Sequence, residues 1–500
     1  MRPESLRHDS LNSRLMSAEE AAQLIRPGTV VGLSGFTRAG DAKAVPAALA
    51  RRAEKEELRL TLATGASLGR GTDGALARSG ALTRRYPFQV DPEMRRAINA
   101  GEILYMDHHL SETADLIRAG HLRPPEVAII EAVAVHGHGI VPTTSVGNSA
   151  SFVQCARSVI VELNAAQSPA LEGVHDIASP AAWGERLPIG ILEPADRIGL
   201  PYLPVDPRDI VAIVPTDMPD SAATVEAPDA STRAIAGHLQ EFLAREVRQG
   251  RLTEALAPLQ AGIGSVANAV LSGFAHGPFT QLTMFSEVLQ DSTFDLMDAG
   301  RLVFASASSI TLGQRQDVLR DFGRYRSRVV LRPQEITNSA EVLRRLGVIA
   351  LNSALEVDIY GNVNSTHVNG SAMLNGIGGS GDFARNARLS VFVTPSTAKA
   401  GALSCIVPMA SHVDHGAQDL DVLVTEQGLA DLRGLAPRER AELIIANCMH
   451  PSFRPLGRDY FRAACRRGGH TPHLLEEALS WHLRAQRTGS MLPPAERLAG

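Results

Sequence analysis

Short apolar segments alternate with longer amphipathic segments along most of the chain. The apolar run at residues 29–33 is followed by a helical pattern at 42–56 and by a second apolar run at 58–63. This order is typical of parallel strands that are joined by helices. The pattern therefore predicts an α/β protein with mainly parallel sheets. Because a chain of 500 residues is too long for one compact core, we expect two domains.

The second half of the chain repeats part of the first. Residues 128–146 and 350–368 are related by a constant offset of 222, and seven of their nineteen positions are identical. After a shift in the offset, the segments 152–159 and 383–391 also resemble each other. The repeat predicts two related domains that arose by duplication.

The second copy has gained about nine residues between Val368 and Phe383, and they include the sequence NGIGGSG at 375–381. Glycine residues allow positive φ angles and let a ligand approach backbone N–H groups closely. We therefore expect this insertion to be a binding loop. The alternative is a flexible loop without function.

A polar segment separates the two copies. Residues 216–229, TDMPDSAATVEAPD, are rich in proline, alanine, serine and acidic residues, and they show no apolar periodicity. We expect an N-terminal domain at 1–215, a linker at 216–229 and a C-terminal domain at 230–500.

Composition and charge exclude several classes of protein. Hydrophobic residues make up 44% of the chain and charged residues 21%, as in ordinary globular proteins. The net charge is −5 and basic and acidic residues are mixed, which argues against nucleic-acid binding. The longest apolar runs are far shorter than the roughly 20 residues of a membrane helix, and the N-terminal residues lack the apolar centre of a signal peptide. We expect a soluble cytoplasmic protein without a membrane partner.

The cysteine and histidine residues point to neither disulfides nor a metal site. The four cysteines are scattered, which argues against a disulfide framework or a zinc knuckle. Histidines lie close together at 108–109, 136–138 and 412–415, but no spacing matches a known ligand set. We expect no bound metal.

The second domain contains a glycine turn near its start. A strand expected at 256–260 leads into Gly262-Ile-Gly264 and then into a helix expected at 265–271. The N–H groups at such a helix end favour a phosphate or a carboxylate. An acidic residue about twenty positions further on completes a pattern similar to a dinucleotide-binding fingerprint, so NAD binding is an alternative.

That acidic residue is Glu287, which comes directly after an expected strand at 281–285. Ligands of α/β proteins bind beyond the carboxyl ends of the strands, so this position suits a catalytic base or nucleophile. The alternative is a carboxylate that faces solvent or caps a helix.

Six segments carry a resemblance to one known family. They are GLSGF at 32–36, GIGSVANAV at 262–270, the segment around Glu287, VDIYGNVNSTH at 357–367, GIGGSGDF at 376–383 and TEQGLADLRG at 425–434. Together they resemble the acetyl-CoA hydrolase/transferase family of class I CoA-transferases, from about residue 15 to about residue 465. The resemblance implies two related domains of the NagB/RpiA/CoA transferase-like type.

The resemblance also implies a set of site residues. Glu287 would form a covalent thioester with CoA, and Asn338 would help to bind the reacting oxygen. The residues implied to bind the CoA substrate or the reacting group are Gln260, Ala261, Gly262, Ile263, Gly264, Asn338, Asn375, Gly378, Gly379 and Lys399. Only three of the 49 basic residues are lysine, which favours a specific role for Lys399, because a compact ammonium group meets a single phosphate or carbonyl where a guanidinium does not fit. The alternative is a lysine retained by chance.

These implications predict an acyl-CoA:carboxylate CoA-transferase that acts by a ping-pong mechanism. Glu287 would attack the thioester carbonyl, and N–H groups of the loop at 376–381 would bind the developing oxyanion, each worth about 3 kcal/mol. The expected substrates are acyl-CoA with acetate, propionate or succinate, and the sequence near residues 17–36 favours succinyl-CoA with acetate or propionate. The family suggests a homodimer and no permanently bound cofactor. The alternatives are an acetyl-CoA hydrolase, in which water is the acceptor, and a non-catalytic acyl-CoA sensor.

Overall fold

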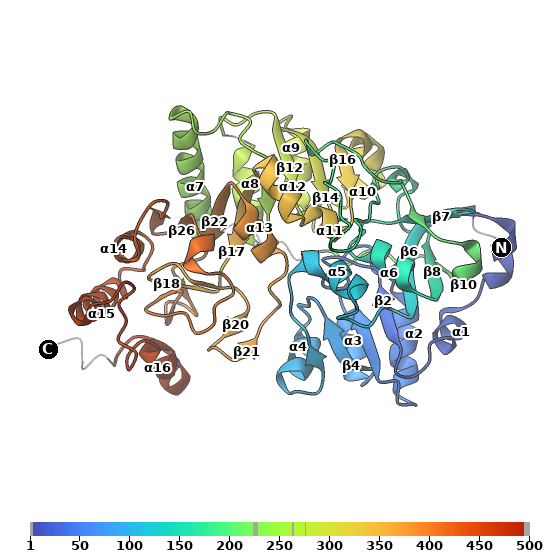
Figure 1. The fold of residues 1–500 in the computed structure, drawn as a ribbon, viewed down its shortest axis with the longest axis horizontal. Coiled ribbons are helices and arrows are strands. Elements are labelled where there is room, and N and C mark those ends of the chain that lie inside the picture. The colour runs from blue at the N-terminus through green and yellow to red at the C-terminus, as the bar shows by residue number, and fades with distance from the viewer. Residues whose placement is uncertain (1–3, 224–228, 263–264, 276, 495–500) are drawn as a thin grey trace. The chain divides into compact units, whose positions relative to one another are not determined.

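The computed structural model describes residues 4–223, 229–262, 265–275 and 277–494, and the chain forms two compact units (Figure 1). The first unit consists of Met1–Val225, Leu282–Leu346 and Gly376–Asp382. The second unit consists of Glu226–Gln281, Gly347–Asn375 and Phe383–Gly500. Two segments from the second half of the sequence therefore belong to the first unit. The domain division at 216–229 stays a prediction.

A parallel sheet forms the N-terminal part of the first unit. Its strands follow the order β10-β8-β6-β2-β3-β4-β5, and every neighbouring pair in this order is parallel. A short strand pairs antiparallel with β6. The strands of this part are β1 (Leu6–Arg7), β2 (Val30–Leu33), β3 (Leu60–Ala63), β4 (Leu82–Tyr86), β5 (Leu104–Tyr105), β6 (Val127–His136), β7 (Gly139–Pro142), β8 (Ser158–Asn164), β9 (Leu203–Pro204) and β10 (Ile210–Thr216).

Helices cover both faces of this sheet, because alternate residues of each strand point to opposite sides. Val31 and Leu33 of β2 share a buried apolar core with residues of α1 to α4. Gly32 points the other way, where a Cβ atom would lie 2.7 Å from the ring of Phe152 in α6, so only glycine fits. The helices are α1 (Ala18–Gln23), α2 (Ala44–Ala53), α3 (Thr72–Arg78), α4 (Pro92–Asn99), α5 (Thr113–Arg118) and α6 (Ser149–Cys155).

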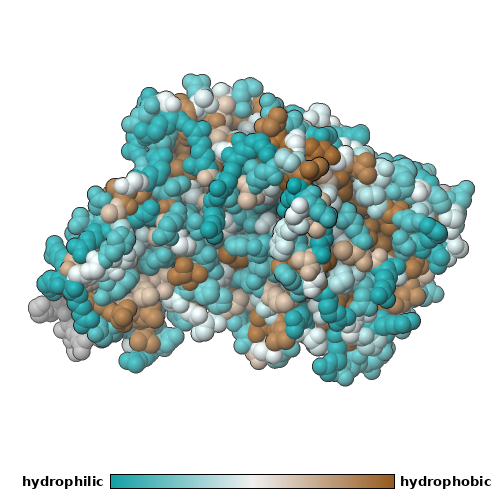
Figure 2. Space-filling view, in the orientation of Figure 1, coloured by the Kyte–Doolittle hydropathy of each residue, from teal (hydrophilic) through white to brown (hydrophobic). Residues whose placement is uncertain are grey.

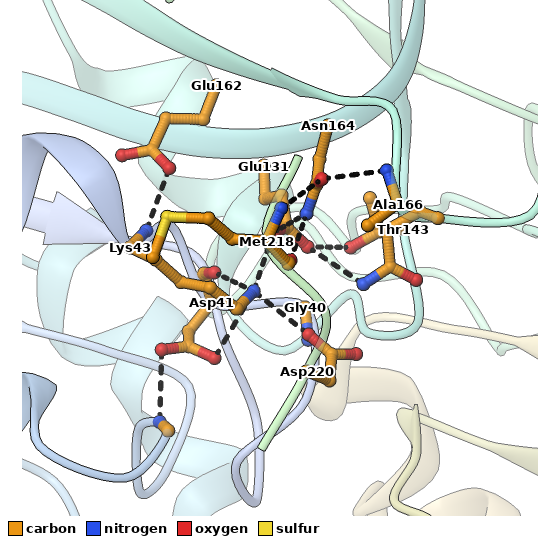
Figure 3. A network of polar contacts seen from close by, with 12 residues as sticks. Gly40, Asp41, Lys43, Glu131, Thr143, Glu162, Asn164, Ala166, Met218 and Asp220 are labelled. Atoms are coloured by element: carbon orange, nitrogen blue, oxygen red, sulfur yellow. Dashed lines mark hydrogen bonds and ion pairs between the residues drawn. The ribbon is translucent and has the colours of Figure 1, made fainter. Parts of the chain in front are cut away.

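A buried group of charged residues, Asp41, Lys43, Glu131 and Asp220, fixes the chain that follows β10 (Figure 3). We call it the Lys43 cluster. Lys43 Nζ lies 2.6 Å from Glu131 Oε1 and 2.9 Å from Asp220 Oδ1. Burial alone would lower the pKa of Lys43, but the surrounding carboxylates outweigh it and raise the pKa. Burial raises the pKa of Glu131, and the charge of Lys43 opposes this rise. The cation thus neutralises carboxylates that have little access to water.

The later segments of the first unit add three parallel strands in the order β16-β14-β12. Two short strands, β13 and β15, continue β12 and β14 and also pair in parallel. The elements of these segments are β12 (Leu282–Phe285), β13 (Val288–Leu289), α9 (Asp291–Asp298), β14 (Leu302–Ala307), β15 (Ser309–Ile310), α10 (Asp317–Arg320), β16 (Val329–Leu331), α11 (Gln334–Thr337) and α12 (Ala340–Leu346).

The second unit contains strands in the order β11-β17-β22-β26-β27, of which only the last pair is antiparallel. Apolar residues of α14, α15 and α16 share a core with β22 and β26. Its elements include α7 (Ala230–Arg248), β11 (Leu259–Ala261), α8 (Ser265–Phe274), β17 (Ile349–Ser353), β18 (Glu356–Asp358), β19 (Val363–Asn364), β20 (His367–Val368), β21 (Ala372–Met373), β22 (Leu389–Val393), β23 (Thr397–Ala398), β24 (Leu403–Ser404), β25 (Ile406–Val407), β26 (Val422–Thr425), β27 (Gly428–Asp431), α14 (Pro437–Asn447), α15 (Arg454–Arg467) and α16 (Ser480–Thr488). Helix α13 (Ser380–Asn386) begins in the last segment of the first unit.

The α/β prediction with mainly parallel sheets is confirmed, and the repeated segments form equivalent elements. In the first copy β6 pairs with β8 in parallel, and in the second copy β17 pairs with β22 in parallel. A helix precedes β8 and β22 in each case, α6 in the first copy and α13 in the second. The strands expected around residues 29–33, 58–63 and 281–285 correspond to β2, β3 and β12.

On the face shown in Figure 2, hydrophilic residues predominate, and hydrophobic residues form several smaller patches between them. Among the described residues, every helix is too short or too polar to span a bilayer. The four cysteines are free thiols, and Cys405 and Cys448 are buried.

Candidate active site

Glu287 lies immediately beyond the carboxyl end of β12. Its backbone carbonyl accepts hydrogen bonds from the N–H groups of Ser308 and Ser309, at 2.9 and 3.1 Å, directly after β14. These bonds fix the peptide, and the side chain of Glu287 remains partly exposed. The sequence interpretation placed Glu287 at a strand end, and the structure confirms that location.

Asn338 is the first partner of the Glu287 side chain. Helix α11 follows β16, and Asn338 comes directly after this helix with only 1% of its surface exposed. Its Nδ2 donates a hydrogen bond of 2.7 Å to Glu287 Oε1. Both residues follow strands of one parallel sheet, the arrangement that places side chains at its carboxyl edge.

The inserted glycine loop packs directly against the Glu287 carboxyl group. A Cβ atom on Gly379 would lie 1.8 Å from Glu287 Oε1 and 2.4 Å from Asn338 Nδ2, so a side chain here would displace the Glu287 carboxyl group and the Asn338 amide. Gly378 has a φ of +61°, a conformation that also favours glycine. The structure therefore brings Glu287, Asn338, Gly378 and Gly379 together within the first unit.

Residues after β5 hold the glycine loop in place. The N–H group of Ile377 donates to both carboxylate oxygens of Asp107, at 2.9 and 3.0 Å. Gly376 lies against Tyr105, because a Cβ atom there would be 2.3 Å from the tyrosine hydroxyl. The loop is thus anchored at its start and closely packed where it meets Glu287.

The backbone N–H groups of Gly378 and Gly379 make no hydrogen bond within the part of the chain that the structure describes. Free N–H groups beside a carboxylate suit an oxygen that gains negative charge during a reaction. Their availability is a property of the insertion, since the first copy has no equivalent segment.

The surroundings of Glu287 favour its protonated form. Burial raises the pKa of Glu287 to about 7, the hydrogen bond from Asn338 opposes this shift, and the charge of Asp382 adds to it. Burial also raises the pKa of Asp382 to about 6. The site therefore holds two neighbouring carboxyl groups with elevated pKa values, which is typical of functional sites.

The other residues implied by the resemblance belong to the second unit. Gln260 is buried in β11, where its Oε1 accepts the Leu351 N–H at 3.1 Å. Gly262 N–H donates to the Leu351 carbonyl at 2.9 Å. Ala261 is also buried in β11. Asn375 Nδ2 donates to the Ser365 carbonyl at 3.2 Å. Lys399 is exposed between β23 and β24. Ile263 and Gly264 lie outside the described residues.

Sequence reasoning missed several neighbours of Glu287, above all Asp382 and Ser111. Asp382 Oδ2 accepts from Asn338 Nδ2 at 3.0 Å, and Asp382 Oδ1 accepts from Ser111 Oγ at 2.6 Å. Asp382 is the acidic residue next to the inserted glycine sequence, and this signal was available. Ser111 precedes Asp382 by 271 residues, and no pattern connects the two.

Metal and NAD sites were the other possibilities raised by the sequence. Within the described ranges, no group of three or more His, Cys, Asp or Glu residues is arranged to hold a metal ion. The acidic residue of the dinucleotide-like pattern is Glu287, whose carboxyl group is held by Asn338 against the glycine loop.

Comparison with protein families now assigns the chain. Residues 4–215 match the model of the acetyl-CoA hydrolase/transferase N-terminal domain, and residues 316–459 match that of the C-terminal domain. The chain belongs to the acetyl-CoA hydrolase/transferase family. The resemblance noted from the sequence is thereby confirmed, and the protein is an enzyme of this family.

Relatives within the family include both transferases and hydrolases. The chain is 47% identical to the succinyl-CoA:acetate CoA-transferase of Clostridium kluyveri, over 97% of this chain and 91% of the relative. It is 43% identical to the propanoyl-CoA:succinate CoA transferase of Escherichia coli, over 95% and 98%. It is also 44% identical to the acetyl-CoA hydrolase of Schizosaccharomyces pombe, over 96% and 98%.

Two solved structures share the fold. RipA from Yersinia pestis gives a TM-score of 0.68 at 21% identity, over 91% of this chain and 97% of that chain. A 4-hydroxybutyrate CoA-transferase from Porphyromonas gingivalis gives a TM-score of 0.64 at 23% identity, over 91% and 99%. These likenesses support the family's two-domain α/β architecture.

Proposed function

We propose that the protein is an acyl-CoA:carboxylate CoA-transferase that works through a glutamyl-CoA thioester on Glu287. The observation that carries the proposal is the contact of the Glu287 carboxyl group with the amide of Asn338 and the backbone of Gly379. A nucleophilic carboxylate needs a fixed position and donors for the oxyanion that forms when it attacks a carbonyl. This site offers both.

The reaction consists of two exchanges at the Glu287 carboxyl group. A Glu287 oxygen attacks the thioester carbonyl of acyl-CoA, the C–S bond breaks, and CoA leaves as the thiolate. The thiolate then attacks the glutamyl carbonyl of the mixed anhydride, which releases the first carboxylate and leaves Glu287 as a CoA thioester. An acceptor carboxylate repeats both steps in reverse, forming the new acyl-CoA and restoring Glu287.

The N–H groups of Gly378 and Gly379, together with Asn338, are the donors we assign to the oxyanions. Each donor of this kind is typically worth about 3 kcal/mol of transition-state stabilisation. A Cβ atom on Gly379 would displace the Glu287 carboxyl group, so glycine at this position keeps the loop backbone close to that group. The absence of a Cβ atom on Gly379 is therefore a requirement of the proposed reaction.

We further propose succinyl-CoA with acetate or propionate as the substrates. The relatives named for succinyl-CoA:acetate and propanoyl-CoA:succinate transfer are 47% and 43% identical over almost the whole chain. In the second unit we assign CoA binding to Asn375, Lys399 and the segment 260–264. The exposed ammonium of Lys399 suits a phosphate or carbonyl oxygen of CoA.

Acetyl-CoA hydrolysis is the second candidate, and it is favoured by the 44% identity to a hydrolase of similar length. In this reaction water accepts the acyl group, either by attack on the glutamyl intermediate or with Glu287 as general base. In the route through a glutamyl intermediate, the first step is the same as in CoA transfer and only the acceptor differs.

Acceptor dependence distinguishes the two activities. We expect CoA exchange between succinyl-CoA and acetate with ping-pong kinetics, and little release of free CoA when carboxylate is absent. Initial rates measured with acetyl-, propionyl- and succinyl-CoA against the three free acids test this expectation. Release of free CoA at the same rate with and without carboxylate would instead establish the hydrolase.

Assembly and location belong to the same proposal. We propose a homodimer in the cytoplasm, with folding domains at 1–215 and 230–500 joined by a linker at 216–229. Light scattering of the purified protein measures the mass of the assembly against 53.3 kDa for one chain. Limited proteolysis tests the linker, and cell fractionation tests the location.

A further inference from the structure

Asp382 is a buried carboxylate beside the proposed nucleophile, and the reaction described above does not use it. It lies in the first turn of α13, three residues after Gly379, and only 7% of its surface is exposed. Ser111 holds it with two bonds: Ser111 Oγ donates to Asp382 Oδ1 at 2.6 Å, and Ser111 N–H donates to Asp382 Oδ2 at 3.1 Å. Its position is therefore fixed independently of Glu287.

The carboxamide of Asn338 bridges the two carboxyl groups. Its Nδ2 carries two protons and donates to Glu287 Oε1 at 2.7 Å and to Asp382 Oδ2 at 3.0 Å. Its Oδ1 accepts from Thr337 Oγ1 at 2.8 Å. Rotating the amide by half a turn would place its oxygen against two carboxyl oxygens, so this network specifies which end of Asn338 faces Glu287.

The charge on Glu287 is not constant during the proposed reaction, and this inference rests on that proposed function. As a carboxylate, Glu287 attracts the Asn338 N–H strongly, because hydrogen bonds to charged groups are the stronger ones. As a mixed anhydride or a thioester, it is neutral and attracts that N–H less. Asp382 does not react, so its hold on Asn338 persists through every step.

We propose that Asp382 is a positioning residue for CoA transfer. It keeps the Asn338 N–H directed at the Glu287 carboxyl group when the latter is a neutral thioester. At that stage an acceptor carboxylate attacks, and the oxyanion on Glu287 needs a donor that is already in place. Without Asp382, the amide has no fixed carboxylate partner in the thioester state.

Asp382 also acts on Glu287 through its charge. The titratable groups beside the Asp382 carboxyl are Glu287, which shares Asn338, and His109, whose charge favours ionised Asp382. The ring of His109 is close enough that a Cβ atom on Gly381 would lie 2.3 Å from it. Since the charge of Asp382 raises the pKa of Glu287, removing this charge should lower that pKa.

The test follows the Glu287 adduct in the full-length enzyme. Rapid mixing with succinyl-CoA, a borohydride quench and peptide mass analysis give the rate of adduct formation, and a second mixing with acetate gives its rate of discharge. In Asp382→Asn we expect both rate constants to fall by about 10- to 100-fold, with the larger loss in discharge. The acid limb of the formation rate should move to lower pH than in the wild type.

Two further variants separate positioning from general damage. Asp358→Asn removes a buried carboxylate with similar partners, since Asp358 accepts from the Asn362 side chain at 2.8 Å and from the Tyr360 N–H at 2.9 Å. Among the described residues Asp358 bonds to neither Glu287 nor Asn338, and we expect wild-type rates and an unchanged acid limb. Ser111→Ala keeps the Asp382 charge but loosens its position, so discharge should slow several-fold while the acid limb stays in place. Ser111→Ala also tests the positioning role if the Asp382→Asn protein does not fold.

Each outcome decides a separate question. If the wild type forms no Glu287 adduct, the proposed function fails before Asp382 is tested. If the wild type forms the adduct, then wild-type rates in Asp382→Asn and Ser111→Ala overturn the positioning role. An equal loss in Asp382→Asn and Asp358→Asn, or a loss in Asp382→Asn without any shift of its acid limb, also overturns it, because packing alone would explain these results.

Discussion

The first unit contains two groups of buried carboxyl side chains, and they differ in what compensates them. In the Lys43 cluster a lysine lies 2.6 Å from Glu131 and 2.9 Å from Asp220. At the candidate active site the shared donor between Glu287 and Asp382 is the neutral amide of Asn338. A cation holds the first group, whereas hydrogen bonds from a neutral amide hold the second.

The comparison relates the proposed role of each carboxyl group to the kind of partner that holds it. A buried cation holds its carboxylates in place, so the Lys43 cluster serves to anchor the chain after β10. A carboxyl group with a neutral partner, partial exposure and a pKa near 7 can change its bonding at low cost. The backbone of Gly379 lies directly against this carboxyl group.

Substitution of Glu287 tests the chemical side of this comparison and should have the largest effect. We expect Glu287→Gln to lower the exchange rate by about 10⁴-fold or more, because an amide cannot form the anhydride. The free energy of unfolding should stay the same or rise, since the repulsion with Asp382 is removed. Exchange assays and urea unfolding measure the two quantities. Substantial exchange activity in this variant would contradict the assignment.

Substitution of Lys43 tests the structural side. Lys43→Met leaves several buried carboxylates without their cation, so we expect a loss of about 3–5 kcal/mol in the free energy of unfolding. The matched control is Lys55→Met, which removes an exposed lysine and should change stability by less than about 0.5 kcal/mol. Equal stability of the two variants in urea would show that the Lys43 cluster does not anchor the fold.

The pH dependence of the exchange rate should show the smallest of the three effects. It tests whether the surroundings of Glu287 perturb the pKa of its carboxyl group. Glu287 reacts only as a carboxylate, and its pKa is raised to about 7. Activity should therefore rise with pH through about 7, and at pH 6 only about a tenth of Glu287 is ionised. Measurement of kcat/KM for the acyl-CoA from pH 5.5 to about 8.5 tests this. An acid limb centred near pH 4.5 would mean that burial does not perturb the nucleophile.

The sequence predicted much of the framework, because local patterns determine it. Apolar periodicity located the strands around residues 29–33 and 281–285, and the repeat explained the shared pairing of β6 with β8 and β17 with β22. The glycine insertion was predicted to bind the oxyanion that forms when Glu287 reacts. Their direct contact, at Gly379, depends on how the chain returns to the first unit at 376–382.

The polar contacts around Glu287 could not be predicted in the same way. Asn338 lies 51 residues from Glu287, and Ser111 lies 271 residues from Asp382. Such contacts arise from tertiary packing, and a single sequence carries no local pattern for them. Lys43 is one of the three lysines of the chain, and no sequence pattern indicated its surroundings. The structure shows it buried among carboxylates.

One measurement tests the central claim most directly. The enzyme is incubated with succinyl-CoA without acceptor, reduced with borohydride and digested, and the peptide that contains residue 287 is analysed by mass spectrometry. The account predicts that the carboxyl group of Glu287 is converted to a primary alcohol, and that Glu287→Gln and a control with free CoA show no such product. An unmodified Glu287 in a preparation with full exchange activity would contradict it.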